Sequence, residues 1–169
     1  MIRIAIEEDI SRILEIERDS ITPPWPHGAL LSEIYSDDAY FAVWDNRTAP
    51  TSHAPFAHEG GGPQGRGLSP VHAPPVLGFI ILRSVADEGE LFQIAVDSSY
   101  RRRGLADDLI EAALDWAGNK NINSIYLEVR KSNEAAIALY VKHGFMQVGY
   151  RKEYFTEPVE DAIIMRMQK

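Results

Sequence analysis

The stretch that decides the fold is Arg101-Arg102-Arg103-Gly104-Leu105-Ala106. The apolar run before it, Ile94-Ala95-Val96, predicts a strand, and the apolar spacing over 105–117 predicts a helix. A helix N-terminus presents unpaired amides and a partial positive charge, so it attracts anions. Gly104 and Ala106 leave room for a phosphate to approach the backbone. The stretch therefore predicts a site for a phosphate-containing ligand, with a solvated basic turn as the alternative.

The loop matches neither of the common nucleotide-binding patterns. It lacks the Gly-Lys-Ser/Thr of a Walker loop and the Gly-x-Gly-x-x-Gly of a dinucleotide-binding fold. Asp107 and Asp108 follow it, where they suit the helix dipole but oppose an anion. A phosphate-containing ligand of another kind remains.

The rest of the chain alternates between short apolar runs and helical patterns. Asn133 is expected to cap the last helix, and Gly118 and Gly144 are expected to end the last two. We predict strands near 2–6, 40–44, 76–82, 90–96, 124–130, 146–150 and 162–167, and helices near 10–16, 28–35, 105–117 and 133–143.

Residues 46–76 differ in composition from both flanks. They hold six of the ten prolines, five of the twelve glycines and three of the five histidines, without an apolar period. We expect a mobile insertion between two hairpin strands, within a single domain that spans 1–169. Its histidines, His53, His58 and His72, have no ligand spacing, so no metal site is expected.

Composition excludes several classes of protein. The chain of 169 residues has no cysteine, which excludes disulfides, cysteine–zinc sites and a thiol nucleophile and suits the cytoplasm. A formal net charge of -8 argues against direct nucleic-acid binding. No apolar run approaches the roughly 20 residues needed to span a membrane, so no membrane partner is expected.

Several motifs in register resemble one family. The pattern Arg-x-x-Gly-x-Ala after a strand resembles the pyrophosphate-binding motif of GNAT-type N-acetyltransferases. The similarity continues through Leu127-Glu128-Val129-Arg130, 132–140 and Gly144-Phe145. The ending over 160–165 is typical of the branch that acetylates the N-terminal alanine of a small-subunit ribosomal protein.

The resemblance implies an α/β (α+β) fold. Its central sheet would be mixed but mostly antiparallel, with six to seven strands and about four flanking helices. It also implies acetyl-CoA as co-substrate, with no metal, and a protein N-terminus as partner.

The resemblance assigns residues to the cofactor. The backbone of Ile94, Ala95 and Val96 would pair with the pantetheine arm, as an added strand would. Asn133 would hydrogen-bond the cofactor, and a plain helix N-cap is compatible with that role. The pyrophosphate would be held largely by main-chain amides of Arg102, Arg103, Gly104, Leu105, Ala106 and Asp107.

Glu128 is the expected general base. Strand alternation gives it the same face as Tyr126 and Arg130, and a carboxylate in a partly dry cleft can take the amine proton. The alternative is a surface glutamate paired with Arg130. Tyr140 is the expected general acid, although a free phenol with pKa of about 10 is a weaker acid than a thiol near 8.5. Hydrogen bonding to the departing thiolate is therefore the safer description.

The acceptor is less constrained. An α-amine, with pKa near 8, is more readily deprotonated than a lysine, with pKa near 10.4, and so suits a modest base. Trp25 and Tyr154 resemble aromatic positions that flank the peptide in this branch, with plain packing as the alternative. A small-molecule amine acetyltransferase and a non-catalytic acyl-CoA-binding module remain as alternative functions.

Overall fold

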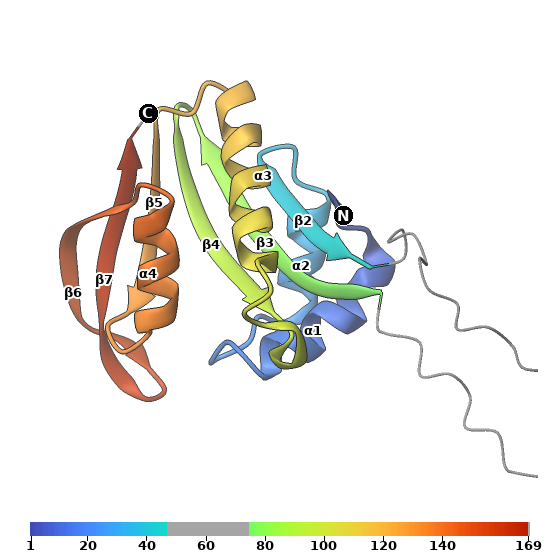
Figure 1. Ribbon diagram of the computed structural model, residues 1–169, viewed down its shortest axis with the longest axis horizontal. Coiled ribbons are helices and arrows are strands. Elements are labelled where there is room, and N and C mark those ends of the chain that lie inside the picture. The colour runs from blue at the N-terminus through green and yellow to red at the C-terminus, as the bar shows by residue number, and fades with distance from the viewer. Residues whose placement is uncertain (47–74, 169) are drawn as a thin grey trace, which may run out of the picture.

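The computed structural model describes residues 1–46 and 75–168. They form a seven-stranded sheet in the order β1-β2-β3-β4-β5-β7-β6, with four α-helices packed on it (Figure 1). The strands are β1 (Ile2–Ile4), β2 (Ala39–Asp45), β3 (Val76–Val85), β4 (Glu88–Val96), β5 (Ser124–Arg130), β6 (Met146–Thr156) and β7 (Val159–Gln168). The helices are α1 (Ile10–Arg18), α2 (His27–Ile34), α3 (Leu105–Asn119) and α4 (Glu134–Lys142).

Neighbouring strands pair antiparallel except β4 and β5, which run parallel. The expected α/β (α+β) class, with a mixed and mostly antiparallel sheet and four helices, is therefore confirmed. Among the described residues, no helix is long and apolar enough to cross a membrane.

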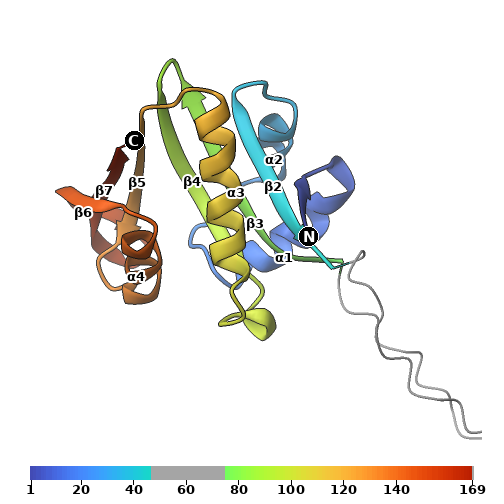
Figure 2. The ribbon, with the colours of Figure 1, turned by 45° about the horizontal axis from the view of Figure 1, so that its top comes forward.

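The helices cover both faces of the sheet (Figure 2). On one face, Leu109 and Ile110 of α3 are fully buried in a cluster that includes Leu127 of β5. On the other face, Ile13 of α1 is buried with Phe79 of β3. Burying a Leu or Ile side chain contributes about 1.5–3 kcal/mol, so both helices are held by their apolar stripes.

Three helix termini test the expected stop and cap signals. The prediction that Gly118 ends α3 was wrong, because the helix runs through Gly118 to Asn119 and the chain reverses at Asn121, where φ is 58°. The cap of α4 is confirmed, because the Asn133 side chain accepts the Ala136 amide at 3.1 Å. Gly144 follows α4 with a φ of 87°, which glycine adopts without strain.

The last two strands extend beyond the predicted 146–150 and 162–167. They pair from Met146 to Thr156, with register irregularities, and so form a long hairpin at one edge of the sheet. The expected insertion at 46–76 falls mostly on residues outside the described ranges. Its flanks, β2 and β3, pair with each other, with Asp45 opposite Val76.

The parallel pair β4–β5 is short and then opens. Pairing extends only from Glu88 to Glu90 on β4, opposite 124–126 on β5. Beyond this point the strands diverge toward the end of the sheet where α3 begins (Figure 1). Because β4 remains paired with β3 up to Val96, the divergence leaves one backbone edge of β4 without a strand partner among the described residues.

Candidate active site

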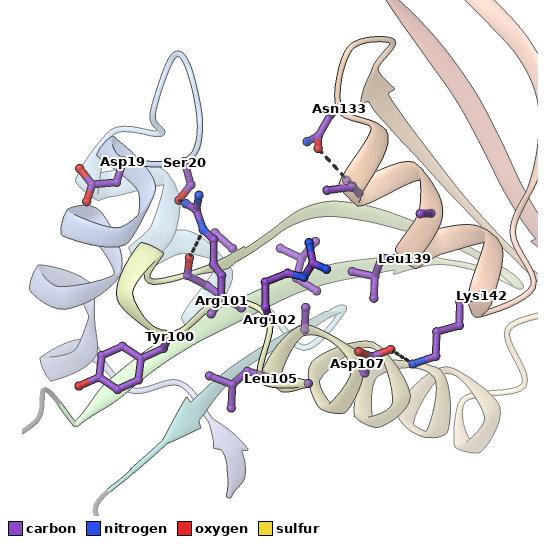
Figure 3. A pocket seen from close by; sticks show the side chains of 18 residues that line it. Asp19, Ser20, Tyr100, Arg101, Arg102, Leu105, Asp107, Asn133, Leu139 and Lys142 are labelled. Atoms are coloured by element: carbon purple, nitrogen blue, oxygen red, sulfur yellow. Dashed lines mark hydrogen bonds and ion pairs between the residues drawn. The ribbon is translucent and has the colours of Figure 1, made fainter.

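A cavity of about 700 Å³ lies where β4 and β5 diverge, between the first turn of α3 and the helix α4 (Figure 3). It is lined by backbone and side chains from four segments, which explains why no single motif in the sequence outlines it. Its lining comprises Asp19, Ser20, Ile94, Ala95, Val96, Tyr100, Arg101, Arg102, Gly104, Leu105, Ala106, Asp107, Asn133, Ala135, Ala136, Ala138, Leu139 and Lys142.

Most residues predicted to hold the cofactor meet at this cavity. The strand residues 94–96, the loop residues Arg102 and 104–107, and Asn133 all line it, whereas Arg103 does not. The carbonyl of Ala95 lies against Gly78 of β3, so the backbone groups of its neighbours in the strand face the gap.

The three arginines of the loop differ in what they contact. Arg101 donates from Nε to the Val96 carbonyl at 3.0 Å and from Nη2 to Ser20 Oγ at 2.9 Å. Arg103 donates to the Ser99 carbonyl at 3.2 Å and lies 5.0 Å from the ring centre of Tyr100. These two guanidinium groups hold the loop in place.

Arg102 is the arginine that remains available for a ligand. Its guanidinium has no partner among the described residues, and its side chain projects into the cavity (Figure 3). Its φ of 62° is an uncommon backbone conformation for a side-chain-bearing residue and precedes Gly104, at φ 83°. The backbone turns here into the free amides of the first turn of α3.

Asp107, one of the two acidic residues in that first turn, is neutralised from across the cavity. Asp107 Oδ1 accepts a hydrogen bond from Lys142 Nζ (Figure 3). It also lies 3.0 Å from His143 Nε2. Lys142, and then His143, hold the pKa of Asp107 below its ordinary value of 3.8. Asp107 therefore links α3 to α4 and stays ionised, while its charge is offset for an incoming anion.

The residues that sequence reasoning missed lie mostly on α4 and on the segment after α1. The face of α4 toward the cavity carries Ala136, Leu139 and Lys142, at the spacing of three residues that follows from its cap at Asn133. That spacing was a usable signal. Asp19 and Ser20 left no such signal, because only the folded chain brings α1 to the end of β4.

Glu128 lies on a second, smaller cavity of about 270 Å³, whose lining includes Glu90, Phe92, Arg151 and Ile164. The burial of alternate residues along β5 confirms that it shares a face with Tyr126. Its ion-pair partner is Arg151, at 3.0 Å, rather than Arg130 as in the surface alternative. Burial and the nearby charge of Glu128 raise the pKa of Glu90.

Tyr140 is on the other side of the sheet and lines neither cavity. It is only 6% exposed and packs against Phe145, with ring centres 5.7 Å apart. Burial raises its pKa above the ordinary phenol value of 10.0. The phenol is thus an even weaker acid than its free form, and its hydroxyl has no hydrogen-bond partner among the described residues.

Trp25 lies in the segment between α1 and α2, and Tyr154 lies on β6. The Trp25 ring lies 5.6 Å from that of Phe92 on β4, and its amide donates to Glu17 Oε1 at 3.0 Å. Burial raises the pKa of Glu17, and the Trp25 amide partly opposes this. Tyr154 is 44% exposed and makes an edge contact with Phe155, at 5.1 Å between ring centres.

No group of three or more possible metal-binding side chains occurs in the described part of the chain. The three histidines of the insertion, at positions 53, 58 and 72, lie outside it.

Comparison with known proteins identifies one family. The model of the acetyltransferase (GNAT) family matches residues 10–145. A ribosomal protein bS18-alanine N-acetyltransferase from Haemophilus ducreyi is 29% identical over 170 residues, which cover 99% of this chain and 99% of that protein. The protein of the same name from Escherichia coli strain K12 is 45% identical over 91 residues, which cover 53% of this chain and 62% of that protein.

A solved structure agrees with the sequence match. The crystal structure of the ribosomal-protein-S18-alanine N-acetyltransferase from Escherichia coli has a TM-score of 0.76 and 29% identity, covering 99% of this chain and 92% of that one. Because the family model matches most of the chain and the fold agrees over nearly all of it, the chain belongs to the GNAT family of acetyltransferases.

Proposed function

We propose that the protein transfers the acetyl group of acetyl-CoA to a protein N-terminus. The acceptor would be the α-amine of the N-terminal alanine of a small-subunit ribosomal protein. The observation that carries the proposal is the cavity at the β4–β5 divergence. There the first turn of α3 and the Arg102 guanidinium meet an edge of β4, and neither the guanidinium nor that edge has a partner in the part of the chain that the structure describes. The name of the Haemophilus ducreyi relative, which matches this chain over nearly the full length of both proteins, supports the alanine substrate. The reaction would take place in the cytoplasm, and the partner would be the protein N-terminus.

The chemistry of the lining suits acetyl-CoA. A pyrophosphate would meet the amides of 104–107 and the charge of Arg102, with Lys142 beside them. The pantetheine arm would run along the open edge of β4 and take the strand position that β5 leaves. Because the Val96 carbonyl already accepts Arg101, we assign the remaining backbone pairing chiefly to Ile94.

Two groups on opposite faces of the sheet would act on the acetyl group. Glu128 approaches from the side of α1 and α2, and Tyr140 from the side of α3 and α4. The amine would attack the thioester carbonyl from the side of Glu128, which accepts the amine proton directly or through a water. Arg151 Nη1 lies 3.0 Å from Oε1 of Glu128, and we assign the amine proton to the second carboxylate oxygen.

On the other side, the sulfur would leave toward Tyr140 as general acid. The raised pKa of this phenol keeps it protonated at neutral pH, so it can always donate a hydrogen bond. It also makes complete transfer of its proton to a thiolate unfavourable, since a thiol pKa is about 8.5. We therefore assign Tyr140 the role of a hydrogen-bond donor that stabilises the developing thiolate.

The experiment that tests the function uses acetyl-CoA and peptides that begin with alanine, with the α-amine free or blocked and one lysine present. Mass spectrometry should find acetylation of the free α-amine alone. Acetylation of lysine only, or of small amines in preference to every peptide, would contradict the proposal.

A matched pair of variants tests the base. Glu128→Gln should lower kcat by about 100-fold or more, the scale of general base catalysis, without weakening acetyl-CoA binding. Glu111→Gln, on the exposed face of α3, should leave kcat unchanged. An unaltered kcat for Glu128→Gln would remove Glu128 from the mechanism.

A further inference from the structure

Arg130, the last residue of β5, joins two segments that are distant in the sequence. Its Nη2 donates to the carbonyl of Thr22, in the loop between α1 and α2, at 3.2 Å. The same nitrogen donates to the carbonyl of Glu157, at the turn between β6 and β7, at 2.8 Å. A single guanidinium nitrogen therefore fixes the spacing between the α1–α2 loop (residues 19–26) and the β6–β7 hairpin end (residues 155–160).

The second terminal nitrogen of the guanidinium also contacts the hairpin end. Nη1 donates to the Pro158 carbonyl at 3.0 Å and to Glu160 Oε2 at 3.2 Å. The ring centre of Phe155 lies 4.3 Å from the guanidinium carbon. Glu160 also accepts the Ser132 amide at 2.6 Å, so the hairpin end is tied in turn to the segment that begins α4.

This arrangement lies beside the reactive opening. Arg130 is two residues after Glu128 on the same strand face, which puts their Cα atoms about 7 Å apart. The α1–α2 loop reaches β4 through the contact of Trp25 with Phe92, and the hairpin end begins just past the pairing of Arg130 with Ala162 of β7. The two segments therefore flank the opening between β4 and β5 on the face from which Glu128 acts.

We propose that Arg130 is a positioning residue that sets the spacing between the α1–α2 loop and the β6–β7 hairpin end, and thereby limits the size of the N-terminal residue that is acetylated. The size limit rests on the proposed function; the spacing does not. An acceptor that approaches the opening must pass between these segments. A fixed spacing admits a small side chain such as alanine and resists a long one such as methionine.

The chemistry of the contact favours arginine over lysine. A planar guanidinium has five N–H donors in a fixed geometry and stacks on an aromatic ring, whereas an ammonium is a compact point charge on a flexible stem. Lysine at this position would reach one segment but would not hold both at a defined separation. Arg130→Lys should therefore restore only part of what Arg130→Ala loses.

The spacing between the two segments can be measured without an activity assay. The chain has no cysteine, so introduced cysteines are the only sites that a thiol-reactive spin label modifies. Spin labels at Pro24→Cys and Thr156→Cys, both exposed positions, report the distance between the two segments by pulsed electron resonance. We expect a narrow distribution in the labelled parent, a broad one with Arg130→Ala and an intermediate one with Arg130→Lys. Arg3→Ala is the matched control, since Arg3 also bridges two segments, through Asp9 and Asp45, but at the far edge of the sheet.

Selectivity is measured on the unlabelled proteins with two peptides that differ only in their first residue, alanine or methionine. In Arg130→Ala the ratio of kcat/KM for alanine to that for methionine should fall by about tenfold or more, while acetyl-CoA affinity is unchanged. Arg3→Ala should keep the ratio, even if it unfolds at a lower temperature.

The outcomes separate the two proposals. A distance distribution unchanged by Arg130→Ala overturns the positioning role, and a broadened distribution with an unchanged ratio overturns the size limit. Parent protein that acetylates neither peptide sinks the proposed function and the size limit with it. In that case the distances between the two spin labels still decide whether Arg130 sets the spacing between the two segments.

Discussion

Replacing Arg102 with alanine should separate ligand binding from stability. The Arg102 guanidinium has no partner among the described residues, so its removal should change the free energy of unfolding by less than about 0.5 kcal/mol. A charge-assisted hydrogen bond to a phosphate contributes about 1.5–3 kcal/mol, which corresponds to an affinity loss of about 10- to 140-fold. Isothermal titration with acetyl-CoA measures the affinity, and urea unfolding measures the stability.

Arg103→Ala is the matched control from the same loop. Its guanidinium is held by the Ser99 carbonyl and the ring of Tyr100, so the variant should lose about 1 kcal/mol of stability and little affinity. Added salt should weaken acetyl-CoA binding more in the parent than in Arg102→Ala. Salt screens the attraction between the Arg102 guanidinium and the phosphates, and the variant has no such attraction to screen. Equal affinity losses in the two variants, or none in Arg102→Ala, would refute the division of roles among the arginines.

Three further variants, with a fourth as a control, test other parts of the protein. Tyr140→Phe keeps the buried ring and should lower kcat by about 10- to 100-fold, the scale of one hydrogen bond to a charged group, in steady-state assays; an unchanged kcat would end its role as donor. Asp107→Asn should be less stable than the parent at neutral pH in urea unfolding. Because Lys142 lowers the folded-state pKa of Asp107 below 3.8, its contribution is present above that pH and lost on acidification through the folded pKa. The two unfolding midpoints should therefore converge at low pH, and a constant gap would contradict the pairing. Gly78→Ala brings a Cβ within 2.9 Å of the Ala95 carbonyl and should cost about 1–3 kcal/mol of stability. Gly149→Ala, whose Cβ would meet its nearest atom at 3.5 Å, should cost less in thermal unfolding, and equal losses would show that the approach of β3 to β4 is not tight.

Local rules predicted the helix termini unevenly. Asn133 was predictable as a cap because its side chain bonds to an amide three residues away, which needs no tertiary contact. Gly118 was misjudged for the opposite reason. Its neighbour Ala117 is fully buried against the sheet, and that packing extends α3 past a residue that local propensity would use as a stop.

The candidate site likewise has some features that local sequence predicts and others that only tertiary contacts decide. Strand alternation alone put Glu128 and Arg130 on one face of β5, because side chains in a strand point to opposite faces in turn. It could not tell that Glu128 pairs with Arg151, or that Arg130 reaches the loop after α1. Both partners come from elsewhere in the chain.

The sequence by itself determined the succession of strands and helices along the chain, the family, and the position of the predicted phosphate-binding loop at 101–106. Each of these depends on residues that are neighbours in the chain. Only the tertiary structure decided which arginine of that loop is available, because Arg101 and Arg103 are engaged by Ser20, Val96 and Ser99 in the folded chain. The cavity is likewise a product of the fold. It exists because β4 and β5 stop pairing after Glu90 and Tyr126, and because α4 and the first turn of α3 lie on either side of the gap.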